Sequence, residues 1–163
     1  MRLGLALVGR GEFEAGLEQL EAARGINSEN NQVHSALGSA YYQMGAAKKR
    51  AFNRDEGEED IQEPEKKAVE CYQTALSLLL SEGKAPPAGV AAAWNNLGTA
   101  QLLNGDIDGA LNSHTTALEA IEHTVKTLQD RFVVAETNIF LGAAYRQQNQ
   151  LDLSLKCHQG GHA

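Results

Sequence analysis

The dipeptide Leu-Gly recurs along the 163-residue chain in comparable local contexts. Its four occurrences are Leu3-Gly4, Leu37-Gly38, Leu97-Gly98 and Leu141-Gly142. Three residues after each glycine lies a further slot, whose occupants, three of them large and apolar, are Leu7, Tyr41, Gln101 and Tyr145. Recurrence of this kind is typical of repeat proteins, in which each repeat buries its apolar side against its neighbours. The sequence therefore predicts stacked repeats instead of one conventional core.

A turn signal lies four residues after the second slot of each repeat. The turn positions hold residue types that tolerate left-handed backbone at a helix end, namely Gly11, Gly45, Gly105 and Asn149. Helical spacing of apolar residues resumes after the turn, as at Phe13, Leu17 and Leu20. Only 6% of the residues are aromatic, and the prominence of Ala, Leu, Glu and Gln favours helices over sheets. We therefore predict an all-α fold built from helix-turn-helix repeats.

The second and third repeats also place aromatic and small residues at set intervals. The third repeat has Trp94, Leu97, Gly98, Ala110 and Ala117, with His114 between the two alanines, and the second has Leu37, Gly38, Tyr41, Ala68, Tyr72 and Ala75. This pattern resembles the tetratricopeptide repeat. The resemblance implies a right-handed α-solenoid of antiparallel helix pairs with about four tetratricopeptide-like repeats. The uneven distances between the four glycines are similar to the longer repeats of kinesin light chains and of Leu-Gly-Asn adaptors.

The repeats divide the chain into four segments that together form one predicted domain over 1–163. Their approximate bounds are 1–30, 31–82, 88–124 and 132–163, with an incomplete last helix. Because Met1 falls partway into the first helix of a repeat, we expect the chain to be an excerpt of a longer array.

The second repeat carries an acidic insertion at about 46–63. Its acidic half has no apolar period, and Gly57 and Pro64 oppose a continuous helix. We predict a solvated loop here, with Pro64 opening the second helix of the repeat, where its missing N–H is harmless. A second loop at 81–87 is predicted to connect two repeats, with the next helix starting near Ala88.

The charge distribution bounds the class of partner. The formal net charge is −7, but seven of the 21 acidic residues lie between Asp55 and Glu65. The remaining acidic residues balance the 14 Lys and Arg, so we expect no broad basic face for nucleic acid or for an anionic membrane. The longest apolar run is far shorter than a membrane span. Cys71 and Cys157 do not form a disulfide scaffold, which favours a cytoplasmic location.

Candidate metal and cofactor sites are weak. Cys157, His158 and His162 are ligand types that zinc accepts, but Gly160-Gly161 interrupts the helical turn that would bring the two histidines together. The acidic run of 55–60 lacks the alternation of a calcium loop. No Gly-rich segment with a following Lys and Ser or Thr is present to bind a nucleotide phosphate. The sequence predicts no metal and no cofactor.

The remaining candidate catalytic and targeting residues have structural interpretations. His34 takes the slot that Trp94 fills in the third repeat, and His114 takes an aromatic slot, so both are predicted to fill repeat interfaces. Neither has a Ser, Cys or Asp neighbour that would make a nucleophile and base pair, and the chain is predicted not to be an enzyme. The basic triplet at 48–50 is interpreted as a helix end instead of an import signal.

The resemblance implies that the first helix of each repeat lines a concave surface. The implied partner-binding residues are Gln32, Ser35, Ser39, Tyr42 and Gln43 from the second repeat, Asn95, Asn96, Thr99 and Leu102 from the third, and Glu136, Ile139, Ala143, Arg146 and Gln147 from the fourth. The amides among them can both donate to and accept from a peptide backbone. Docking of a chaperone C-terminus is disfavoured, because its cationic and amide positions hold Gln32, Ala36, Glu136 and Phe140, and only Asn96 agrees.

The leading hypothesis is a protein-protein interaction scaffold or adaptor that holds a partner peptide or helix in the concave groove. Two alternatives stay open: a regulatory arm or subunit of an enzyme, and a module that associates with itself through exposed solenoid ends. The sequence does not identify the partner.

Overall fold

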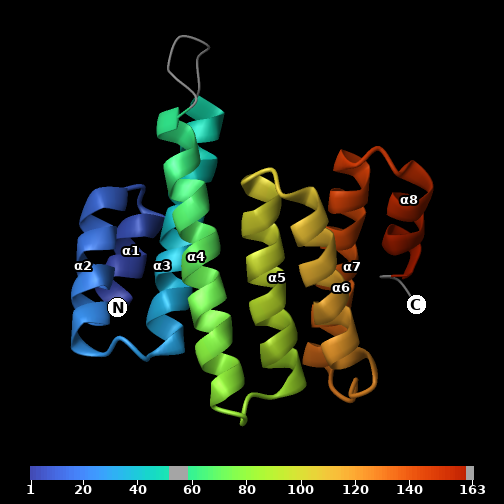
Figure 1. The fold of residues 1–163 in the computed structure, drawn as a ribbon. Helices are drawn as coiled ribbons and strands as arrows, with labels where there is room; N and C mark the ends of the chain where they lie inside the picture. The colour runs from blue at the N-terminus through green and yellow to red at the C-terminus, as the bar shows by residue number, and fades with distance from the viewer. Residues whose placement is uncertain (52–58, 161–163) are drawn as a thin grey trace. The chain divides into compact units, whose positions relative to one another are not determined.

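The computed structural model describes residues 1–51 and 59–160, and these residues form α-helices with no strand among them (Figure 1). In chain order the helices are α1 (Arg2–Gly9), α2 (Phe13–Ile26), α3 (Asn31–Ala51), α4 (Glu59–Ser81), α5 (Pro87–Leu103), α6 (Ile107–Glu122), α7 (Leu128–Gln147) and α8 (Leu151–Gly160). The predicted all-α class is confirmed.

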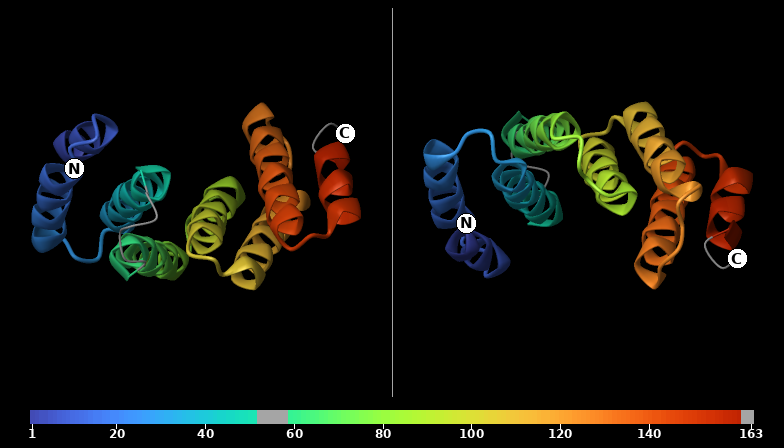
Figure 2. Two further views of the ribbon diagram at one scale, coloured as in Figure 1. Left: turned by 90° about the horizontal axis from the view of Figure 1, so that it is seen from above. Right: turned by 90° about the horizontal axis from the view of Figure 1, so that it is seen from below.

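The helices form two compact units. The N-terminal unit, Met1–Ser81, contains α1 to α4, and the C-terminal unit, Glu82–Ala163, contains α5 to α8. Within each unit the helices lie side by side in two pairs (Figure 2): α1 with α2 and α3 with α4, then α5 with α6 and α7 with α8. In both units the first helix of the second pair also packs against both helices of the first pair.

The Leu-Gly positions form the contacts that the repeat pattern requires. Leu37, Leu97 and Leu141 are all buried. The glycine after each leucine faces a side chain of the next helix, at Gly38 and Tyr72 and again at Gly98 and His114. A Cβ atom on Gly38 would lie 2.9 Å from the Tyr72 ring, so only glycine allows the two helices to approach this closely.

The predicted turns are correct at three positions and wrong at one. Gly11, Gly105 and Asn149 all have positive φ angles, as expected at a helix end. Gly45 instead lies buried inside α3, which continues to Ala51. The alanines after Gly45 are strong helix formers, and the basic triplet at 48–50 falls in the last turn of α3, where cations interact favourably with the helix dipole.

The prediction of a solvated loop at about 46–63 is also wrong over most of its length. Residues 46–51 belong to α3 and 59–63 belong to α4, while 52–58, with Gly57, lie outside the described residues. Pro64 lies inside α4 and does not open it. Pro64 and Glu65 are buried, and the Glu65 carboxylate lies 3.1 Å from the Lys49 ammonium group of α3. This ion pair joins α4 to α3 beside the proline.

The starts of two later helices follow local chemistry. α5 begins at Pro87, one residue before the predicted start, and the proline accepts this place because its missing N–H has no partner in a first turn. α7 begins at Leu128, four residues before the predicted start of the fourth repeat. The Thr127 hydroxyl accepts from the backbone N–H of Asp130, and the Asp130 carboxylate accepts from that of Thr127. This capping box extends the helix toward its N-terminus.

Candidate functional site

Apolar side chains are exposed along one face of α7. Phe132 is 61% exposed and Ile139 is 55% exposed. They are seven residues apart and therefore lie on the same side of the helix. The residues on this side, which we call the α7 stripe, are Leu128, Phe132, Ala135, Glu136, Ile139, Ala143 and Arg146. The opposite face of α7 is buried in the C-terminal unit at Val133, Thr137, Leu141 and Ala144.

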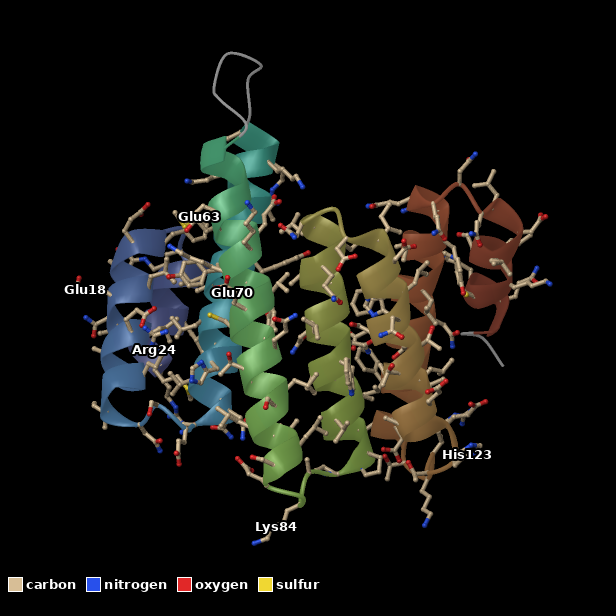
Figure 3. The ribbon with its side chains drawn as sticks, viewed as in Figure 1. Glu18, Arg24, Glu63, Glu70, Lys84 and His123 are labelled. Atoms are coloured by element: carbon tan, nitrogen blue, oxygen red, sulfur yellow. The ribbon has the colours of Figure 1, made fainter. Side chains whose placement is uncertain are left out.

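The α7 stripe differs from the charged faces of α2 and α4 in the N-terminal unit. There, Glu18 and Arg24 of α2 and Glu63 and Glu70 of α4 project from the helices (Figure 3). These surfaces carry exposed ion pairs, including Arg24 with Glu21 at 2.7 Å and Lys67 with Glu63 at 3.2 Å. Charged surfaces of this kind are ordinary solvated helix faces, whereas a row of exposed large apolar side chains is typical of a contact surface for another protein.

Polar groups lie at the C-terminal end of the α7 stripe. Arg146 and Gln147 are exposed in the last turn of α7, and Glu136 is half-buried near its middle. The Arg146 guanidinium can bind a carboxylate through two parallel hydrogen bonds, and the Gln147 amide can pair with a peptide group. The stripe therefore combines an apolar centre with a cationic end.

The α5 candidates lie in the same unit as the α7 stripe, and α5 packs against α7. Asn96 is exposed, while Thr99 and Leu102 are half-buried. The Thr99 hydroxyl donates to the backbone carbonyl of Asn95 at 2.8 Å, which leaves its oxygen able to accept. Asn96 is thus the α5 candidate most accessible to a ligand.

Asn95 was predicted to bind a partner, and that prediction is wrong. Asn95 is buried, its Nδ2 donates to Thr137 Oγ1 at 2.8 Å, and its Oδ1 lies 3.0 Å from His114 Nδ1. Both ends of the amide are therefore occupied by the protein itself. The physical reason is that α7 covers this side of α5, so the residue faces a neighbouring helix and not a ligand.

His114 fills a repeat interface, as predicted. The imidazole is fully buried and stacks on Phe140, with 5.3 Å between the ring centroids. Burial lowers the pKa of His114 to about 4, so the ring is neutral near pH 7. His34 is likewise buried, and its Nε2–H donates to the carbonyl of Ser28 at 2.8 Å. Neither histidine is placed as a general base.

The hydrogen bonds around His114 determine its tautomer. The Thr137 hydroxyl donates its one proton to the Val133 carbonyl at 2.7 Å, so it must accept from the Asn95 amide. Asn95 then presents its oxygen to His114, which requires the proton to be on His114 Nδ1. The network orders one side chain from each of α5, α6 and α7.

The α3 candidates lie in the N-terminal unit, separately from those of α5 and α7. Gln32 is exposed, and Ser35, Ser39, Tyr42 and Gln43 are half-buried. Gln43 Nε2 donates to Ser39 Oγ at 3.2 Å, so these two side chains are partly satisfied within the helix. Among the described residues of α3 no large apolar side chain is exposed, so the α3 residues form a weaker candidate surface than the α7 stripe.

His158, one of the candidate metal ligands near the C-terminus, takes part in helix contacts instead. His158 Nδ1–H donates to the Ser154 carbonyl at 2.7 Å, and the ring lies against Gly142, as His114 lies against Gly98. His162 lies outside the described residues. Among residues 1–51 and 59–160, no group of three or more His, Cys, Asp or Glu side chains is placed to hold a metal.

The two cysteines are free thiols. Burial raises the pKa of Cys71 to about 11 and also raises the pKa of Cys157, so both are protonated near neutral pH and neither is an activated nucleophile.

In the part of the chain that the structure describes, no helix is both long and apolar enough to cross a membrane.

Phe132 and Leu128 belong to the candidate site although sequence reasoning missed them. The candidates of the fourth repeat began at Glu136, and the first turns of α7 were left out. The signal was present, because Phe132 and Ile139 are one heptad apart and on the side opposite to Leu141.

Comparison with known proteins supports the fold. No protein-family model matches the chain, and no curated protein matches it significantly. Among solved structures, BtubC (BKLC) from P. vanneervenii, a kinesin light chain-like tetratricopeptide repeat protein, matches with a TM-score of 0.70 and 22% identity. The match covers 97% of this chain and 59% of that one. The chain therefore has an all-α, tetratricopeptide-like helical repeat fold.

Proposed function

We propose that the chain is a non-catalytic interaction scaffold that binds a helix or extended peptide of a partner protein on the α7 stripe. The observation that supports this proposal is the exposure of Phe132 and Ile139 on one face of α7. Helical repeats commonly present such a face to their partners, and the fold class is consistent with this role. Two free cysteines fit a cytoplasmic setting.

The stripe favours an amphipathic partner helix. Such a helix would place apolar residues at i, i+4 and i+7 against Phe132 and Ile139 and an acidic residue near Arg146. Asn96 of α5 would add hydrogen bonds to polar groups of the partner. Burying a large apolar side chain contributes about 1.5–3 kcal/mol, so Phe132 and Ile139 would supply most of the affinity.

The distance of 44 residues between Gly98 and Gly142 and the fold of BtubC (BKLC) support the finer hypothesis of an adaptor with kinesin light chain-type long repeats. This hypothesis concerns the repeat type alone. The partner would be recognised by the chemistry of the stripe.

The experiment that tests the proposal selects helical peptides against the purified chain from a displayed random library. We expect the selected peptides to lose at least tenfold in affinity for Phe132→Ala and for Ile139→Ala. Leu80→Ala removes an exposed leucine of α4 outside the stripe and serves as the matched control. Equal affinity for all three variants and the parent chain would rule out the α7 stripe as the binding surface.

A further inference from the structure

The buried histidine of α6 has a ring nitrogen without a hydrogen-bond partner. His114 is 0% exposed, and its Nδ1–H donates to Asn95 Oδ1 at 3.0 Å. Among the described residues, no group forms a hydrogen bond with His114 Nε2. This nitrogen lies against α5 at Gly98, where an added Cβ atom would be 2.8 Å from it. A neutral imidazole is tolerated here, but an N–H on Nε2 would have no acceptor.

The surroundings of His114 offer no charge to offset a proton on the ring. α5 contains no charged residue between Pro87 and Leu103. The charged residues of α6 and α7 are exposed or half-buried, and they are Asp108, Glu119, Glu122, Asp130, Arg131, Glu136 and Arg146. Burial is the cause that lowers the pKa of His114 to about 4, and no charged side chain contributes to this shift. A positive charge on the ring would therefore be buried without compensation.

The same ring helps to hold α7 in place. It stacks on Phe140, and through Asn95 it orders Thr137, whose hydroxyl donates to the Val133 carbonyl. Val133, Thr137 and Phe140 each directly follow a residue of the α7 stripe in the sequence. The buried contacts and the stripe thus belong to one segment of helix, with different sides for each. If this segment leaves α5 and α6, the stripe leaves with it.

We propose that the network of Asn95, His114 and Thr137 is a proton-sensitive latch for the α7 stripe, an inference that rests on the proposed function of the stripe. While His114 is neutral, the network holds α7 against α5 and α6, and the stripe is presented to a partner. A proton on Nε2 adds an N–H without an acceptor and a positive charge to the contact between these helices. α7 is then released, and partner binding is lost.

Hydrogen exchange of the 163-residue chain, followed by NMR between pH 6 and 4.5, tests the latch. Released α7 exposes an imidazole with the ordinary pKa of 6.5, whereas the held ring has a pKa of about 4. The ratio of released to held α7 should therefore rise about 20-fold over this range. We expect the protection factors of the Thr137 and Leu141 amides to fall by the same factor. Protection of the Leu37 amide in the N-terminal unit should stay constant.

Histidine variants separate the latch from other effects of acid. His114→Gln keeps a donor for Asn95 Oδ1 but binds no proton in this range, so protection of the α7 amides should change less than about twofold. If circular dichroism shows that this variant loses helix, His114→Phe, which can stack on Phe140, replaces it. His123→Gln at the exposed end of α6 (Figure 3) and His158→Gln in α8 are the matched controls and should behave like the parent chain.

A helical peptide selected at pH 7 and free of histidine connects the latch to partner binding. At pH 5 and ten times its dissociation constant, the peptide should raise the protection of the α7 amides about tenfold, because it binds held α7 alone. Equal exchange with and without bound peptide would show that released α7 also binds and would overturn the regulatory role. If selection yields no binding peptide, the proposed function and this role both fail, while exchange without peptide still decides whether the latch exists.

Three exchange results would overturn the latch itself. One is protection of the α7 amides that does not change with pH. Another is the same pH dependence in His114→Gln as in the parent chain, which would assign the effect to other groups. The third is a parallel loss of protection at Leu37, which would show unfolding of the whole chain instead of release of α7.

Discussion

The side-chain amide of Asn95 donates a 2.8 Å hydrogen bond to the hydroxyl of Thr137, 42 residues further along the chain. This bond joins the first helices of two successive pairs in the C-terminal unit. It also explains why Asn95 and Asn96, adjacent in sequence, have different roles: one amide is buried in a network with His114, and the other is exposed on the outer side of α5.

Replacing Asn95 with alanine should destabilise the fold. The substitution leaves Thr137 Oγ1 without its donor and His114 Nδ1 without its acceptor in a buried site, which costs about 1–3 kcal/mol. Asn96→Ala is the matched control and should change the free energy of unfolding by less than about 0.5 kcal/mol. Urea unfolding of the two variants measures the difference, and equal stability would contradict the role of the network.

Acidification should destabilise the C-terminal unit through His114. The unfolded imidazole has an ordinary pKa of 6.5, whereas burial holds the folded value at about 4. Between these pH values the unfolded chain binds a proton that the folded chain does not, so stability falls as the pH falls. The loss approaches about 3 kcal/mol below pH 4. His114→Phe should remove this part of the slope in unfolding experiments between pH 7 and 4, and an unchanged slope would argue against it.

Gly98→Ala should destabilise the chain although alanine is the better helix former. A Cβ atom at this position would lie 2.7 Å from Cε1 of the buried His114 ring, and such overpacking costs about 1–3 kcal/mol. Gly25 of α2 has nothing within 4 Å of an added Cβ, so Gly25→Ala should stabilise by up to about 1 kcal/mol. Thermal unfolding should therefore shift in opposite directions for the two variants. A higher unfolding temperature for both variants would show that helix propensity decides both and would contradict overpacking at Gly98.

The turn positions and the buried leucines of the fold could be predicted from the local sequence. The positive φ angles at Gly11, Gly105 and Asn149 and the burial of Leu37, Leu97 and Leu141 follow from residue type and spacing. The continuation of α3 through Gly45 does not, because a glycine permits either a turn or a helix and its neighbours decide. The start of α4 before Pro64 does not follow from local patterns either, and beside this proline Glu65 pairs with Lys49 of another helix, a contact that no local pattern shows.

The candidate site was predictable in part. Ile139 and Arg146 lie on an exposed face, as the repeat position implied, and the spacing of Phe132 could have added it. The burial of Asn95 could not be foreseen, because it depends on the side from which α7 approaches α5. Neighbouring residues of a helix point in different directions, so one can lie in the core while the next lies at the surface.

The most direct test of the central claim is methyl NMR of the chain titrated with a selected helical peptide. Ile139 lies in the α7 stripe, and Ile26 of α2 is exposed but lies outside it, so the two isoleucine methyl signals form an internal comparison. We expect the Ile139 signal to shift with saturation while the Ile26 signal stays unchanged. Binding of the peptide with no change at Ile139 would contradict the assignment of the α7 stripe as the partner surface.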